Sequence, residues 1–251
     1  MNDPRPPVIV VPQEVVQSLI TLSHAVNGPV TLVGGWAVRC RLQMGFREAR
    51  PTSDLDVLIT SQLRPAAAAL DAAVLVQDDP QHPCRLSGLP LLVDLLAEGP
   101  QEILQGADPI RGGMIEDADG LRLLVPPMAS LLSALTGEVV LQGKDPDSRA
   151  TALLPCAGAL FASKVGNVAL EEREPGKRAS DAEDALRLLE GFGAAALLHD
   201  LGPADPAAVT RLRGLLEAMG SSALLAQARL SGYEPDAAQV THAIDRMLDA
   251  L

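Results

Sequence analysis

Residues 31–60, TLVGGWAVRCRLQMGFREARPTSDLDVLIT, decide the fold that we expect for the chain. The apolar run 31–33 predicts the end of a short buried strand. Gly34 and Gly35 then let the backbone turn where a side chain would obstruct an approaching phosphate. The mostly apolar stretch 36–44 predicts a helix, and the free amides at a helix start are ready donors to phosphate oxygens. This half of the stretch therefore predicts a strand, a tight turn and a helix suited to an anion.

Two acidic residues, Asp54 and Asp56, begin the second strand that the stretch predicts, after a loop marked by Pro51. Side chains alternate between the faces of a strand, so both carboxylates point the same way while Leu55 and Val57 face the other side. Carboxylates this close can share a hard cation such as Mg²⁺, which also removes their repulsion. A solvated strand start with two surface aspartates is the alternative, because short acidic motifs are common.

A third acid, Asp94, stands alone in the apolar run 89–97, LPLLVDLLA. The run predicts a strand. A lone buried carboxylate costs free energy, and a place beside the Asp54/Asp56 pair at a metal would remove that cost. An exposed strand end is the other interpretation.

The glycine pair and the acidic run resemble the signature of a known family. The residues that carry the likeness are Gly34, Gly35, Arg50, Thr52, Asp54, Leu55 and Asp56. They are similar to the DNA polymerase β-like nucleotidyltransferase superfamily, particularly its AbiEii-type toxins and related bacterial branches. There a glycine turn holds the triphosphate, two carboxylates on one strand hold metal, and a neighbouring strand supplies a third.

This resemblance implies a role for each matching residue. Asp54, Asp56 and Asp94 would be the catalytic, metal-binding carboxylates, with two Mg²⁺ ions expected. The nucleotide would be bound by Gly34, Gly35, Arg50, Thr52 and Lys164.

A second block, in the C-terminal half, also resembles the family. It consists of Lys164, Arg173, Lys177, Asp181 and Asp184. In the family a helix with a lysine precedes an arginine-containing turn and a K-D-x-x-D helix, whereas here Ser180 directly precedes the first aspartate. The resemblance implies that Lys164 reaches a phosphate, and a solvated helix lysine is the alternative. The two aspartates either share in function or only favour a helix N-terminus through its dipole.

Composition limits the partners of the chain. Its 251 residues are 47% hydrophobic, which is ample for a sizeable core, but only 2% are aromatic, so platforms for stacking bases are scarce. The net charge of −12 works against broad attraction to nucleic acid. A local basic patch could still form, or the residues concerned could be solvated: Arg39, Arg41, Arg47 and Arg50. The three cysteines show no spacing that indicates a disulfide framework or a zinc site.

The start of the chain indicates where the protein works. MNDPRPPVIVVPQE lacks a basic segment followed by a long apolar one, so no signal peptide is predicted. The uncharged stretch 15–38 is broken by Asn27-Gly28-Pro29 and is too polar for a membrane span. We therefore expect a cytoplasmic protein without a membrane partner.

The order of the patterns predicts an α/β (α+β) fold in two domains. Residues 1–126 are expected to form a nucleotidyltransferase-type mixed sheet with flanking helices, and 127–251 a helical bundle. The first part holds a possible edge strand at 8–11, helices at 14–26 and 64–73, and a hairpin at 112–125. Strands are expected to cease after that hairpin. In the second part Ser180 is expected to cap a helix.

These patterns lead to one main functional hypothesis. It is an Mg²⁺-dependent enzyme that moves an NMP from an NTP, such as ATP, to an acceptor hydroxyl. The acceptor would be RNA, such as tRNA, or a protein, and a toxin of this kind would have a cognate antitoxin as partner. A small-molecule, aminoglycoside-type transferase and a catalytically silent nucleotide-binding scaffold are the alternatives.

Overall fold

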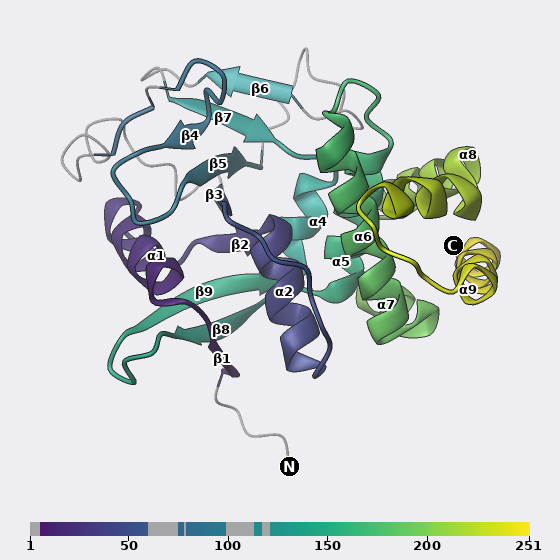
Figure 1. Ribbon diagram of the computed structural model, residues 1–251, viewed down its shortest axis with the longest axis horizontal. Coiled ribbons are helices and arrows are strands. Elements are labelled where there is room, and N and C mark those ends of the chain that lie inside the picture. The colour runs from purple at the N-terminus through teal and green to yellow at the C-terminus, as the bar shows by residue number, and fades with distance from the viewer. Residues whose placement is uncertain (1–5, 60–74, 78, 99–112, 117–120) are drawn as a thin grey trace.

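A mixed β-sheet forms the centre of the molecule (Figure 1). The computed structural model describes residues 6–59, 75–77, 79–98, 113–116 and 121–251. The strands in this part of the chain are β1 (Val8–Val10), β2 (Thr31–Val33), β3 (Leu55–Ile59), β4 (Arg85–Leu86), β5 (Val93–Ala97), β6 (Gly113–Glu116), β7 (Arg122–Val125), β8 (Thr136–Gln142) and β9 (Arg149–Pro155). They lie in the order β1-β8-β9-β2-β3-β5-β7-β6, and β4 pairs with β5.

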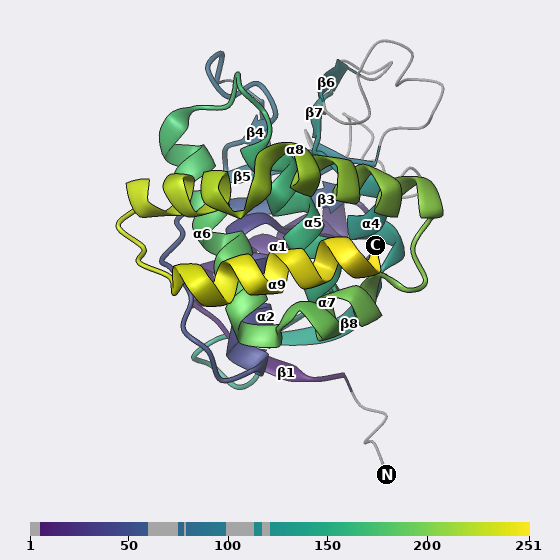
Figure 2. The same ribbon diagram turned by 90° about the vertical axis from the view of Figure 1, so that its right-hand side faces the viewer.

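Helices flank the sheet and gather beside it. They are α1 (Gln13–Ala25), α2 (Gly34–Met44), α4 (Ala129–Ala134), α5 (Ala157–Val168), α6 (Pro175–Phe192), α7 (Ala194–Leu201), α8 (Pro206–Leu230) and α9 (Ala237–Ala250). Figure 1 shows α5 to α9 stacked at the right of the sheet, and Figure 2 views that helical side face on. The expected α/β fold with a C-terminal helical region is thus confirmed.

The middle of the sheet determines where the acidic residues lie. β2 and β3 are antiparallel, with Val33 opposite Asp56. β3 and β5 are parallel, with Asp56 opposite Asp94. Because residues paired across neighbouring strands project to the same face, the second and third acids lie side by side.

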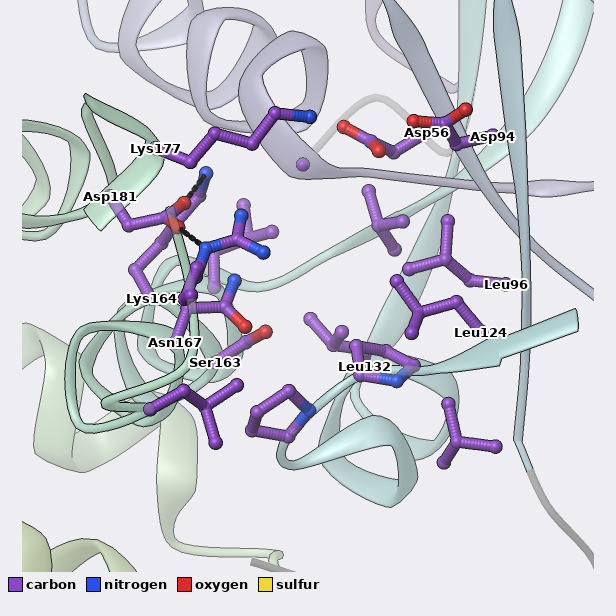
Figure 3. Close-up of a pocket in the computed structure, with 18 residues that line it drawn as sticks. Asp56, Asp94, Leu96, Leu124, Leu132, Ser163, Lys164, Asn167, Lys177 and Asp181 are labelled. Carbon is purple, nitrogen blue, oxygen red and sulfur yellow. Dashed lines mark hydrogen bonds and ion pairs between the residues drawn. The ribbon is translucent and has the colours of Figure 1, made fainter. Parts of the chain in front are cut away.

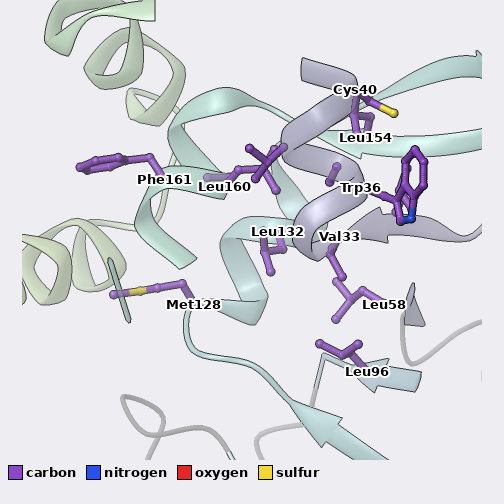
Figure 4. Packing of buried hydrophobic residues seen from close by; sticks show 14 of the residues in the cluster. Val33, Trp36, Cys40, Leu58, Leu96, Met128, Leu132, Leu154, Leu160 and Phe161 are labelled. Atoms are coloured by element: carbon purple, nitrogen blue, oxygen red, sulfur yellow. The ribbon is translucent and has the colours of Figure 1, made fainter. Parts of the chain in front are cut away.

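The core between sheet and helices is aliphatic, as the scarcity of aromatic residues predicts. Figure 4 shows Leu58 and Leu96 of the sheet facing α2 and α4, while Leu160 and Phe161 extend the packing into α5. One continuous cluster of buried residues joins the sheet to the helices. The helical region therefore packs on the sheet through a shared core.

The expectation that strands cease after the 112–125 hairpin is wrong. β8 and β9 form an antiparallel hairpin, and β9 pairs with β2 in the same sheet. Residues 139–142 and 149–152 alternate between more and less exposed positions, which is typical of a half-buried strand. The polar loop 143–148 is the turn between them. The division at residue 126 stays a prediction, and the last strand of the sheet ends at Pro155.

The expected start of the helix after residue 173 is also wrong. Ser180 lies inside α6, which begins at Pro175. A proline is favoured in the first turn because its missing N–H needs no partner there, and the Glu174 side chain accepts a hydrogen bond from Gly176 N. The helix therefore already includes Lys177 in its first turn.

Some of the other expected elements are present, and the rest lie outside the described residues. The edge strand, the first helix and both strands of the hairpin are present as β1, α1, β6 and β7. The expected helix 64–73 and the hairpin turn at 119–120 lie outside the described residues. No helix in the part of the chain described here combines the length and the apolar character needed to cross a bilayer.

Phe161 and Phe46 provide a matched test of this packing. Phe161 is 0% exposed, whereas Phe46 is 98% exposed. We expect Phe161→Ala to lower the free energy of unfolding by about 3 to 5 kcal/mol and Phe46→Ala to change it by less than about 0.5 kcal/mol. Urea unfolding of both variants measures this, and equal effects would contradict the position of α5 in the core.

Candidate active site

The glycine turn packs directly on the acidic strand. Gly34, the first residue of α2, has φ of +62°, a conformation that favours glycine. A Cβ added there would lie 1.8 Å from Asp56 Oδ2, so any other residue at 34 would displace the Asp56 side chain as well as strain the backbone. A Cβ on Gly35 would lie 2.8 Å from Thr52 Oγ1 and 3.2 Å from Arg50 Nη2. The start of α2, the loop before β3 and the acid on β3 are therefore in close contact.

The three acids differ in their partners. Asp94 is buried and accepts two hydrogen bonds from Arg85, from Nε at 2.7 Å and Nη2 at 2.9 Å. Asp54 is partly exposed, with Arg85 Nη2 at 3.8 Å and Lys177 Nζ at 4.0 Å from its Oδ2. Asp56 has no hydrogen bond or ion pair with any described residue. Figure 3 shows its carboxylate beside that of Asp94.

Asp56 is held in an unfavourable state for a carboxylate. Burial, above all, raises its pKa from 3.8 to about 6. Lys164 opposes the rise, while Asp94 and Asp54 add to it by repulsion. An acid that is kept at an energetic cost and lacks an internal partner is typical of a functional site.

A cluster of buried ion pairs faces the acids from the helices. Lys164 Nζ on α5 lies 2.7 Å from both Asp181 Oδ1 and Asp184 Oδ2 on α6. Arg173 Nε donates to Asp181 at 2.6 Å, and Arg50 from the loop before β3 donates two hydrogen bonds to Asp184. The cluster thus joins α5, α6 and the strand unit.

Charge pairing governs the protonation states in this cluster. Burial lowers the pKa of Lys164, but the two aspartates outweigh it and raise that pKa overall. Burial likewise raises the pKa of Asp181, and Lys164 and Arg173 outweigh it, so the net direction is down. Lys164 is only 5% exposed, and two buried carboxylates depend on it. It therefore has a structural role, and two carboxylates account for two of the three donors of its ammonium.

A cleft lies between the acids and this cluster. It holds about 740 Å³ of non-protein space, its open mouth to solvent included. Figure 3 shows Asp56 and Asp94 on one wall and Lys164, Lys177 and Asp181 on the other. An adjoining polar hollow shares five residues with the cleft, which are Asp56, Lys164, Arg173, Lys177 and Asp181. It is lined further by Gly35, Arg50, Thr52, Ser53, Asp54 and Ser180.

The predicted site residues are therefore brought together. Gly34, Asp56, Asp94 and Lys164 line the cleft, and Gly35, Arg50, Thr52 and Asp54 line the adjoining hollow. Of the four arginines that could form a basic patch, only Arg50 borders the site. Arg39 lies over the Trp36 ring, and Arg41 donates to backbone carbonyls at the end of β9.

Three polar residues at the site were missed by sequence reasoning: Arg85, Ser163 and Asn167. Arg85 lies on the two-residue strand β4, which is too short to give a periodic pattern, and only its pairing with β5 brings it to Asp94. Ser163 and Asn167 flank Lys164 on α5. Their helical spacing from one another could have indicated a shared face.

The carboxylates fit Mg²⁺ in some respects and not in others. Their oxygens are the donors that this ion prefers, and the unpaired charge of Asp56 calls for a cation. The described residues nevertheless contain no ready group of three metal-ligating side chains, and Arg85 occupies Asp94. Asp54 and Asp56 would be the residues to hold an ion, and Asp94 could join them if Arg85 moved.

No family model matches the chain, and neither the curated proteins nor the solved structures contain a significant match.

The raised pKa of Asp56 predicts how stability depends on pH. In the folded state the Asp56 carboxyl keeps its proton up to about pH 6, whereas in the unfolded state it keeps it only up to about pH 3.8. The free energy of unfolding that this group contributes is therefore greatest below pH 3.8 and falls as the pH rises from 3.8 to about 6. We expect Asp56→Asn to remove this fall and to raise the free energy of unfolding at pH 7 by about 2 kcal/mol, allowing for partial exposure.

Urea unfolding in EDTA at pH 4 and pH 7 measures the effect. Asp245→Asn, on the exposed face of α9, is the matched control and should leave the pH dependence as it is. Destabilisation by Asp56→Asn at pH 7 would mean that the carboxylate has a stabilising partner.

Proposed function

We propose that the protein is an Mg²⁺-dependent nucleotidyltransferase that moves an NMP from an NTP to an acceptor hydroxyl. One observation carries the proposal: the glycine turn at the start of α2 packs on Asp56, an acid that has no partner among the described residues and lies beside Asp94. An anion-binding helix start and a cation-binding carboxylate thus adjoin each other. A triphosphate with its metal supplies the complementary pair, a negatively charged phosphate next to a positively charged ion.

The residues of the chain would bind and orient the substrates. Backbone amides at Gly34 and Gly35 would donate to phosphate oxygens, where the lack of side chains permits close approach. Lys177 and Arg173, on the opposite wall, would balance the charge of the phosphates and of the departing pyrophosphate. Asp54 and Asp56 would hold Mg²⁺, and Asp94 would join them once Arg85 had released it. The bound ion would neutralise the triphosphate and activate the acceptor hydroxyl.

The acceptor class is narrowed by the surface around the site. The predicted basic patch is divided, since Arg39 and Arg41 are engaged elsewhere, and the net charge is −12. This supports an acceptor that is engaged mainly within the cleft, such as one RNA or tRNA end or one protein hydroxyl. A toxin-like activity of this kind, with an antitoxin partner in the cytoplasm, is the form that we propose, and a small-molecule acceptor is the alternative.

The contact between Arg85 and Asp94 favours a second candidate, a catalytically silent nucleotide-binding scaffold. A guanidinium that makes two hydrogen bonds to the third carboxylate supplies the positive charge that a metal would supply. If Arg85 never releases Asp94, a nucleotide could bind without turnover. The two candidates differ in pyrophosphate release.

Loss of Asp56 tests the enzyme hypothesis. Mutation of groups that merely orient a metal ligand costs about 10- to 100-fold in activity, so we expect Asp56→Asn to lower pyrophosphate release by more than that. The assay supplies Mg²⁺, each NTP, and separate pools of tRNA, protein and aminoglycosides. Asp245→Asn should retain full activity. Unchanged activity of Asp56→Asn would refute the mechanism, and binding without pyrophosphate in the unsubstituted protein would favour the scaffold.

Arg85 should compete with divalent cations for Asp94. We expect Arg85→Gln to bind Mn²⁺ about tenfold more tightly than the unsubstituted protein, because the carboxylate is then free, and to be less stable in EDTA. Paramagnetic resonance of free Mn²⁺ measures the affinity, with Arg149→Gln on β9 as the control. Weaker Mn²⁺ binding by Arg85→Gln would show that the guanidinium supports the metal site.

A further inference from the structure

The cleft has an apolar half that the phosphate and metal chemistry does not use. Its wall is formed by Leu96, Leu124, Pro126, Leu132, Leu160 and Leu170. Figure 3 shows Leu96, Leu124 and Leu132 below Asp56 and Asp94, across the cleft from Lys164, Ser163 and Asn167. We call this part of the cleft the apolar lobe.

Two polar side chains of α5 point into the apolar lobe without a partner. Ser163 is only 6% exposed, yet its hydroxyl makes no hydrogen bond with any described residue. The amide of Asn167 likewise has no partner within the described ranges. The two residues are four positions apart and so lie on one face of the helix. Figure 3 shows both directed into the cleft, next to Lys164.

Gly166 sets the distance between α5 and the neighbouring wall of the cleft. A Cβ on Gly166 would lie 2.7 Å from Pro127 Cβ, and Pro127 lines the cleft, so this glycine allows the two to approach closely. Ser163 and Asn167 both line the cleft. They therefore present a hydroxyl and an amide to whatever occupies it, with no competing partner among the described residues.

The shape and chemistry of the lobe favour a flat heterocycle. Aliphatic walls suit the two faces of a ring, and a side-chain amide with a donor and an acceptor matches the edge of a nucleobase. A sugar carrying several ammonium groups would lose its hydration against such walls. The charged residues line the same cleft.

We propose that the apolar lobe holds the nucleobase of the NTP and that Ser163 and Asn167 bind its edge, which makes them residues that determine base specificity. The inference rests on the proposed function, because it places the phosphates of the same nucleotide at Gly34 and Lys177. It adds the prediction that base and phosphates are bound by separable sets of residues.

Titration calorimetry with Mg²⁺ separates the two sets. The ligands are the four NTPs and inorganic tripolyphosphate, which has no base. We expect Asn167→Leu to weaken the preferred NTP about tenfold, with a smaller effect for Ser163→Ala, and to leave tripolyphosphate unchanged. Lys177→Gln is the matched control, since its loss should weaken tripolyphosphate and all four NTPs alike.

Each outcome bears on one claim. If the unsubstituted protein binds neither tripolyphosphate nor any NTP, the proposed function fails and the inference with it. If it binds both but Asn167→Leu weakens them equally, or if all four NTPs bind equally well, the lobe does not read the base and only the inference is overturned. Should Asn167→Leu not fold, Asn167→Asp keeps the shape but loses the amide donor, and it should change the order of preference among the four bases.

Discussion

The site depends on one steric constraint, the contact between Gly34 and Asp56. No Cβ fits between the start of α2 and the Asp56 carboxylate, and the backbone of Gly34 adopts a left-handed conformation there. The antiparallel pairing of β2 with β3 brings the two residues together, and the parallel pairing of β3 with β5 adds Asp94. The sheet register thus places the start of α2 and two carboxylates within one small region. Few substitutions at residue 34 could preserve that arrangement.

The helical region contributes the opposite wall of the cleft through charge pairing. Lys164 joins α5 to two aspartates of α6, and Arg50 joins one of these aspartates to the strand unit. Burying such ion pairs costs desolvation free energy, and removing one partner costs still more because it leaves a buried charge unpaired. The cluster therefore fixes the positions of α5, α6 and the loop before β3 more than it adds to the free energy of unfolding. It joins α5 to its neighbours at Lys164, and Ser163 and Asn167 of the same helix also line the cleft. One helix therefore connects the two halves of the site.

Much of the site was predictable because its residues lie in locally distinctive patterns. Gly34-Gly35 punctuates an apolar run, Asp54 and Asp56 share the period of a strand, and Asp94 interrupts an apolar one. Arg85 was not predictable, since a two-residue strand leaves no period and its contact with Asp94 depends on tertiary pairing. β8 and β9 were missed because their polar turn resembles a linker. The start of α6 was missed because Ser180 is a better local cap than Glu174, yet the proline at 175 starts the helix earlier.

The central claim is that Gly34, Asp56 and Asp94 surround one metal–triphosphate site. Paramagnetic broadening of backbone amide resonances by Mn²⁺, with and without an NTP, tests it most directly because it locates the ion without requiring turnover. We predict that trace Mn²⁺ with an NTP broadens first the amides of Gly34, Gly35 and the residues flanking Asp56 and Asp94, and that Asp56→Asn abolishes this selectivity. Broadening spread over the exposed acids of this acidic chain, unaffected by the NTP or by Asp56→Asn, would contradict the account.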